Sequence, residues 1–174
     1  MVERILVGID GSDNARDALD FACRISAQIG GDLTILHVLM HGRSAEEMER
    51  LARAEHIVRD SAPQLLPGEA SVPMGMREFL AHPEVDRWRA ITEIGNHIVA
   101  EARERAEEAG ARNVSAMTVN GDYADGILDT AEEIGADLIV IGRRGLGRIR
   151  SAILGSVSNK VMQNAECSVL AVHA

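Results

Sequence analysis

Aromatic side chains are scarce in this sequence: they make up 2% of its residues, with one Trp, one Tyr and two Phe. Because hydrophobic residues still account for 46%, valine, isoleucine, leucine and alanine must supply almost all of the packing volume. Aliphatic runs of this kind are typical of parallel sheets that are buried on both faces. With 174 residues and a mass of 18.7 kDa, the chain has the usual size of one domain. We therefore expect a single core of aliphatic side chains.

Cysteine is also scarce, since Cys23 and Cys167 are far too few for a disulfide framework. Both fall in apolar segments, and we expect reduced thiols in the core. Acidic residues outnumber basic ones by 27 to 18, and the formal charge of −9 disfavours binding to nucleic acid or anionic membranes. No run approaches the roughly 20 apolar residues that span a bilayer, and the charged N-terminus is unlike a secretory signal. We expect a soluble, cytoplasmic protein without a membrane span.

Short aliphatic runs alternate with segments of helical periodicity along most of the chain. The runs at 5–9, 33–40, 114–119, 138–141 and 168–172 predict strands. Helical spacing predicts helices over 13–29, 86–109 and 124–134, and one that starts at Ser151 or Gly155 and ends at Asn164. Such alternation requires parallel pairing with right-handed crossovers. The expected fold class is α/β, a Rossmann-like, doubly wound open sheet of five parallel strands in the order 3-2-1-4-5, with helices on both faces.

Two loops follow strands at the point where ligands bind in open α/β sheets, beyond the carboxyl ends and where the strand order reverses. The first, at 8–12, is either a simple turn around Asp10 or part of a ligand site. The second begins at Gly142 and reads GRRGLGRIRSAILGSVS. Its glycines permit close approach of a ligand to the backbone. Gly155, Ser156 and Ser158 lie at an expected helix start, where free N–H groups and the helix dipole favour an anion.

The second loop also concentrates positive charge. It carries no acidic residue between Gly142 and Lys160, and its basic residues are Arg143, Arg144, Arg148, Arg150 and Lys160, the only lysine of the chain. On an acidic protein this segment would attract a phosphorylated small molecule, although a solvated helix face with ordinary turn glycines gives the same pattern. Neither a Walker A motif nor a Gly-x-Gly-x-x-Gly motif is present, so standard P-loop and dinucleotide sites lose support.

The spacing Gly142-x2-Gly145-x9-Gly155-Ser156 resembles the signature of the universal stress protein (UspA-like) family in its ATP-binding branch. The resemblance extends to ILVGIDGS, ILHV, GDYADGILDTAEEIGADLIVIGRRG and CSVLAV, and covers nearly the whole chain except residues 42–85. It implies an adenine nucleotide held between the ends of the first and fourth strands. The cofactor-binding positions that it implies are Gly8, Ile9, Asp10, Val38, Ile141, Gly142, Arg144, Gly145, Gly155, Ser156, Val157 and Ser158.

Each group of these positions receives a role from the resemblance. Asp10 would face the nucleoside, with Gly8 and Ile9 lining its pocket, and the backbone of Val38 would pair with the adenine edge. Gly142, Arg144 and Gly145 would border the ribose and phosphates, and residues 155–158 would hold the phosphate tail. Ser156 could serve instead as a helix cap or accept a phosphoryl group. No catalytic residue and no protein metal site is expected.

The resemblance implies an ATP-binding, nucleotide-dependent regulatory protein of the stress response, which forms a homodimer through its C-terminal strand. AMP or ADP could replace ATP, and Mg²⁺ would accompany the nucleotide. The alternatives are a slow ATPase or autophosphorylating phosphotransferase on the same fold, and a scaffold whose site is empty or takes AMP or a cyclic nucleotide. A labelled γ-phosphate distinguishes the enzyme from the regulator.

Residues 42–85 interrupt the alternation and are too long for an ordinary connection. Ser44 and Glu47 fit a capping box for a helix that ends near Asp60. We interpret the segment as an insertion in a single domain spanning 1–174, which packs locally, covers the nucleotide or docks a protein partner. His37 and His41 are expected to have packing or surface roles, because no acidic or cysteine partner shows metal-ligand spacing.

Overall fold

The computed structural model describes residues 2–39, 85–143 and 154–173, with side chains in the second range described from Ile91 onward. Contacts divide the chain into two units, residues 1–41 with 95–174, and residues 42–94. The first unit contains the whole sheet. The helix expected near 44–60 and nearly all of the expected insertion lie outside the described residues. Whether the chain is one domain with an insertion therefore stays a prediction.

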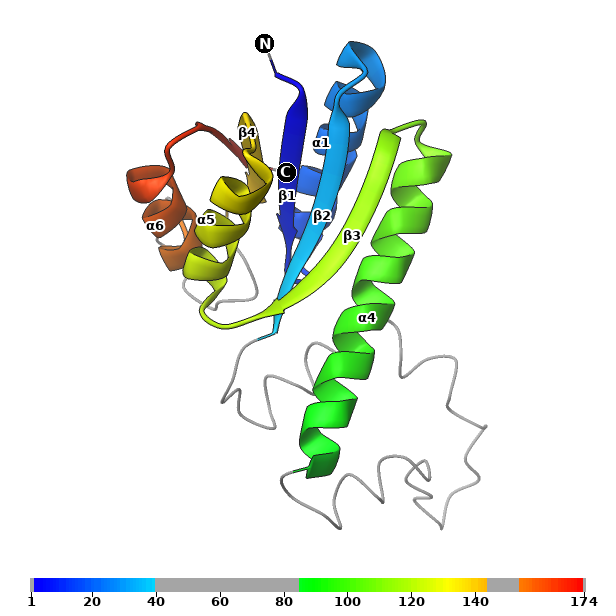
Figure 1. The fold of residues 1–174 in the computed structure, drawn as a ribbon, viewed down its shortest axis with the longest axis vertical. Coiled ribbons are helices and arrows are strands. Elements are labelled where there is room, and N and C mark those ends of the chain that lie inside the picture. The colour runs from blue at the N-terminus through cyan, green and yellow to red at the C-terminus, as the bar shows by residue number, and fades with distance from the viewer. Residues whose placement is uncertain (1, 40–84, 144–153, 174) are drawn as a thin grey trace. The chain divides into compact units, whose positions relative to one another are not determined.

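The sheet has five parallel strands in the order β3-β2-β1-β4-β5 (Figure 1). The strands are β1 (Arg4–Ile9), β2 (Asp32–Leu39), β3 (Arg112–Asn120), β4 (Leu138–Gly142) and β5 (Ser168–Val172). The helices are α1 (Asp13–Ile29), α4 (Val85–Glu108), α5 (Tyr123–Ile134) and α6 (Ser156–Asn164). The expected fold class and strand order are confirmed. None of the helices in the described ranges has the length and apolar character to cross a membrane.

Aliphatic side chains fill both faces of the central strands, as the scarcity of aromatics requires. Ile5, Leu6 and Val7 of β1 are all fully buried. Alpha helices α5 and α6 cover one face of the sheet and α1 covers the other (Figure 1). The cluster beneath α5 and α6 consists of Leu6, Leu36, Val38, Ala124, Ile127, Ala131, Ile139, Ile141 and Val161. This double coverage is what a buried parallel sheet needs.

The two cysteines differ in burial. Cys23 lies in α1 and is fully buried, and burial raises the pKa of its thiol to about 11. Cys167 is only half-buried, and burial again raises the pKa of its thiol. Both are free thiols. The expectation of a core thiol is confirmed for Cys23, whereas Cys167 packs at the margin of the core because it precedes an edge strand.

Candidate anion-binding site at the carboxyl edge of the sheet

Strands β1 and β4 are neighbours at the centre of the sheet, and the chain leaves them toward opposite faces. Gly8 of β1 is opposite Leu36 on one side and Ile141 on the other. After β1 the chain enters α1, and after β4 it reaches α6, which covers the other face. The strand order reverses here, so this edge is the expected ligand position of an open α/β sheet.

The turn after β1 is organised by Asp10. Its Oδ1 accepts a hydrogen bond from the Ser12 N–H at 3.0 Å, and Gly11 between them has a φ of 78°. Ser12 in turn caps α1, since its Oγ accepts from the Ala15 N–H at 3.2 Å. The Asp-Gly-Ser sequence thus forms an Asx turn that leads into a helix. Asp10 has the turn-forming role, and its contact with a nucleoside stays a prediction.

Three of the expected nucleotide positions are packed into the core. Val38 and Ile141 have only 2% and 3% of their surface exposed and belong to the cluster under α5 and α6. A Cβ at Gly8 would lie 2.9 Å from Ile127 Cδ1 of α5. The β1 ladder ends at Ile9, opposite His37, so Val38 lies one residue beyond the last pair. These positions can offer a ligand their backbone, because their side chains or side-chain space are already occupied.

Gly142 ends β4 against the first turn of α1. A Cβ at this position would lie 2.9 Å from both the backbone carbon and the backbone oxygen of Asn14. Because backbone cannot give way as a side chain can, close packing of α1 on β4 requires glycine here. Sequence reasoning missed this contact, since the glycine was assigned to ligand approach and nothing in the sequence pairs Gly142 with Asn14.

Hydrogen bonds hold the start of α6 next to the end of β4. The Arg143 N–H donates to the Val172 carbonyl at 2.7 Å, and the Gly155 N–H donates to the Arg143 carbonyl at 2.9 Å. The Ser158 hydroxyl donates to the Gly142 carbonyl at 2.8 Å. The residues in between, which include the expected site residues Arg144 and Gly145, lie outside the described ranges.

The N-terminus of α6 has no side-chain cap. Gly155 is the N-cap residue, with φ −71° and ψ 160°, and no side-chain hydrogen bond closes this end. Ser156 is therefore the first helical residue and is exposed, so the interpretation of Ser156 as the helix cap was wrong. The N–H groups of Ser156, Val157 and Ser158 have no partner inside the helix by its geometry. They point out of the helix start beside the end of β4.

Lys160 is held by two carboxylates at the start of α5, the N-cap residue Asp122 and Asp125 in the first turn. Its Nζ lies 2.6 Å from Asp125 Oδ1 and 3.3 Å from Asp122 Oδ1. These two partners, Asp125 first, raise the pKa of the lysine. Lys160 thus does not add to a basic patch, because its charge is more than balanced by the two carboxylates. Of the basic residues counted in this loop, Arg143 is half-buried, and Arg144, Arg148 and Arg150 lie outside the described ranges.

Comparison with known proteins bears on the family and on the fold. The model of the universal stress protein family matches residues 1–173. The chain belongs to this family. Universal stress protein YxiE of Bacillus subtilis is 34% identical over 172 residues, covering 99% of each chain. Universal stress protein Rv1636 of Mycobacterium tuberculosis is 31% identical, covering 97% of this chain and 94% of that relative.

A solved structure of a universal stress protein in complex with cAMP shares the fold. Its TM-score is 0.64 at 27% identity, and the match covers 99% of this chain and 97% of that one. The family signature recognised in the sequence is thus supported by whole-chain similarity. This whole-chain similarity shows the family and the fold of the chain.

Histidine 37 has a packing role in this universal stress protein. His37 is 2% exposed, and because a carbonyl only accepts, its Nδ1 must carry the hydrogen that bonds the Ile9 oxygen at 2.9 Å. His41, its suggested metal partner, lies outside the described residues. Within the described ranges no group of three His, Cys, Asp or Glu side chains is placed to hold a metal ion.

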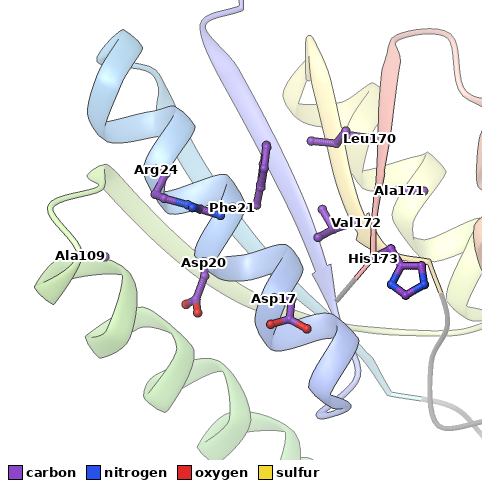
Figure 2. A pocket seen from close by; sticks show the side chains of 9 residues that line it. All are labelled: Asp17, Asp20, Phe21, Arg24, Ala109, Leu170, Ala171, Val172 and His173. Carbon is purple, nitrogen blue, oxygen red and sulfur yellow. The ribbon is translucent and has the colours of Figure 1, made fainter.

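A groove of about 760 Å³ lies between α1 and β5 (Figure 2). It is lined by Asp17, Asp20, Phe21, Arg24, Ala109, Leu170, Ala171, Val172 and His173. Phe21 is 37% exposed beneath the Arg24 guanidinium, whose carbon lies 5.0 Å from the ring centre. The groove shares no residue with the expected nucleotide site. Sequence reasoning missed this groove, and Phe21, the one aromatic residue of α1, is the signal that could have pointed to it.

Proposed function

We propose that this universal stress protein binds an adenine nucleotide, ATP with Mg²⁺, at the carboxyl edge between β1 and β4. The observation that supports it is the uncapped start of α6, tied beside the end of β4. Three N–H donors at a helix start and the positive end of the helix dipole favour a phosphate group. The relative that was solved with cAMP supports an adenine nucleotide as the ligand class.

The proposed contacts follow the fold. Residues 8–10 and the backbone of Val38 and Ile141 would hold the nucleoside, with Asp10 at the ribose. Gly142, Arg144 and Gly145 would border the ribose and the first phosphate. The N–H groups of 156–158 would hold the phosphate tail. Mg²⁺ keeps several of its waters and is commonly bound through nucleotide phosphates, so it would arrive with ATP.

Calorimetric titration of the purified protein with ATP, ADP, AMP, cAMP and GTP, each with and without Mg²⁺, tests the ligand. We expect micromolar binding of ATP, strengthened by Mg²⁺, and at least about tenfold weaker binding of GTP. Mass spectrometry of any nucleotide that co-purifies gives an independent identification. Tighter binding of cAMP than of ATP would contradict ATP as the ligand while retaining the site, and no binding of any nucleotide would contradict the site.

The regulatory role predicts that occupancy changes the protein without consuming the nucleotide. Hydrogen exchange with and without ATP should differ beyond the site itself, and γ-labelled ATP should leave neither label on the protein nor free phosphate above background. Label on the protein would favour the alternative, an autophosphorylating protein. Ser156 would then be the candidate acceptor, because its position at the helix start is exposed while Ser158 is buried.

We also propose that the protein forms a homodimer through β5. This strand pairs with β4 on one side at the edge of the sheet, and its residues from Val169 to Val172 are half-buried. An apolar edge strand is a template for pairing with another strand. Sedimentation at micromolar concentration should give a dimer mass, and Ala171→Lys should shift it to monomer. A monomeric wild type would contradict the dimer. The cytoplasmic location stays a prediction.

A further inference from the structure

The hydroxyl hydrogen of Ser158 is already engaged in a hydrogen bond within the protein. Its side chain is in α6 and only 4% of the residue is exposed, and its Oγ donates to the Gly142 carbonyl at 2.8 Å. A serine hydroxyl has one hydrogen to donate. Ionised phosphate oxygens accept hydrogen bonds and do not donate them. The hydroxyl therefore cannot serve a phosphate without giving up Gly142.

The acceptor of this bond is a fixed point of the fold. Gly142 is paired with β5 on one side and packed against the Asn14 backbone on another. The second bond between the same segments joins the Gly155 N–H to the Arg143 carbonyl. One turn later Val161, fully buried, anchors α6 in the core. Among the hydrogen bonds of the described residues, two join the start of α6 to the end of β4 and the residue after it. One is made by the Ser158 hydroxyl and the other by the Gly155 amide.

We propose that Ser158 is a positioning residue, whose hydroxyl fixes the start of α6 relative to the end of β4, and that it does not bind the nucleotide through this hydroxyl. The inference rests on the proposed nucleotide site and narrows it. The start of α6 contributes backbone N–H groups, and a direct hydroxyl contact is assigned to Ser156, which is exposed and lies two residues earlier on the same helix. The backbone N–H of Ser158 remains one of the three donors.

The test compares Ser158→Ala, Ser158→Thr and the matched control Ser156→Ala. In the nucleotide-free proteins, amide exchange is measured for residues 155–159. Ser158→Ala should speed exchange of the Gly155 N–H by at least about fivefold, because local opening becomes easier when one of two ties is lost. Ser158→Thr keeps the O–H and should restore slow exchange. Ser156→Ala should leave exchange unchanged.

Nucleotide affinity is then measured for the same proteins with adenosine, AMP and ATP. We expect Ser158→Ala to lower the affinity for AMP and for ATP by at least about threefold, and the affinity for adenosine by less. Ser158→Thr should restore the affinity of the wild type. Weaker ATP binding by Ser158→Ala with unchanged exchange in the free protein would mean direct contact and would overturn the proposal, as would no change in either measurement. If the wild type binds no nucleotide but Ser158→Ala still exchanges faster, the proposed function is contradicted, and the positioning role of the Ser158 hydroxyl is retained.

Discussion

Helices α5 and α6 lie side by side on one face of the sheet and begin at the same edge, but their first turns are finished differently (Figure 1). At α5, Asp122 Oδ1 accepts from the N–H groups of Ala124 at 3.1 Å and Asp125 at 3.3 Å. At α6, the corresponding residue is Gly155, which has no side chain to offer. The α5 start is capped by its own side chain, whereas no side chain caps the α6 start, as the proposed phosphate contact requires.

The missing cap has a small cost in stability, and under the proposed function it has a large effect on ligand binding. Glycine is only a few tenths of a kcal/mol worse than aspartate as an N-cap residue, so an uncapped α6 sacrifices little stability. An aspartate at the same place would occupy the amide donors and repel a phosphate. The residue at the N-cap therefore decides whether a helix start stabilises the fold or binds a ligand, and exchanging the two caps tests this.

The largest effect is expected from Gly155→Asp, which gives α6 the cap of α5. The backbone at Gly155 already has the extended conformation of an N-cap residue, so the substitution needs no rearrangement of φ and ψ. We expect ATP affinity to fall by more than about tenfold, while the free energy of unfolding rises by about 0.5 kcal/mol. Calorimetric titration and urea unfolding measure the two changes.

Gly155→Asn is the matched control, because asparagine caps a helix as well as aspartate but carries no charge. Gly155→Asn should stabilise the protein and lower ATP affinity less than Gly155→Asp does. The difference between the two variants separates the effect of occupying the N–H donors of α6 from the effect of charge repulsion on the phosphate. Wild-type affinity in the Gly155→Asp protein, together with a gain in stability, would show that phosphate does not lie at the start of α6.

The reverse change, Asp122→Ala, removes the cap of α5. Loss of an N-cap side chain costs about 1 kcal/mol, and here Lys160 also loses one of its two partners. Urea unfolding should show this loss, whereas ATP affinity should change by less than about threefold. Asp122→Asn keeps a cap acceptor and should recover most of the stability. A large affinity loss in Asp122→Ala with normal stability would mean that α5 belongs to the ligand site.

The sequence predicted the fold well because its local signals agree with one another. Aliphatic runs mark all five strands, and Ser12 and Gly30 mark both ends of α1, as the structure has them. The start of α6 was less certain, since both Ser151 and Gly155 can open a helix, and the structure begins it at Ser156. The expected insertion lacks such agreement, with scattered prolines and glycines, and lies outside the described residues.

The site was harder to predict than the fold, because glycine has more than one reason to be where it is. Gly142 reads as a ligand-facing position from its signature, yet the contact with Asn14 already requires it. At Gly8 the constraint is softer, because a Cβ would meet the Cδ1 end of the Ile127 side chain of α5 at 2.9 Å, and that side chain can move. Such contacts join segments far apart in the sequence, so spacing within one loop cannot reveal them.

Charge counting failed for the same reason. Lys160 was counted with the arginines of its loop, but its partners Asp122 and Asp125 lie more than thirty residues earlier and meet it only in the folded protein. Ser158 is a second example of a side chain whose partner the sequence does not reveal. In the sequence its hydroxyl looks as available to a ligand as that of Ser156, but in the structure it donates to the Gly142 carbonyl. Sequence reasoning points to this edge as a candidate site, which stays a prediction, and tertiary contacts show which of its side chains are already engaged.

The contribution of the Asp122 cap to the free energy of unfolding should also depend on pH. We expect this pH effect to be smaller than the loss caused by Asp122→Ala. The Asp125 N–H, and then Lys160, hold the pKa of Asp122 below its usual value of 3.8. A lowered folded pKa stabilises the protein above pH 3.8, and this contribution is lost as the pH falls from there through the folded pKa. The free energy of unfolding of the wild type minus that of Asp122→Asn should therefore shrink on acidification from about pH 6 to about pH 2. A constant difference would contradict the assignment.

The smallest effect is expected from Lys160→Gln, which removes the link between the two helix starts. Because all three side chains are about half exposed, the free energy of unfolding should fall by less than about 0.5 kcal/mol, and less still in 1 M salt. Arg103→Gln, which breaks an equally exposed pair with Glu107 in α4, is the control for this loss.

ATP affinity decides whether Lys160 belongs to α5 or to the ligand. With its ammonium held by Asp122 and Asp125, its removal should change ATP affinity by less than about twofold. A fall of about tenfold would mean that the lysine leaves its carboxylates when the nucleotide binds, which costs little for an exposed pair. The starts of α5 and α6 would then act together on the phosphate, and capping alone would no longer explain why they differ.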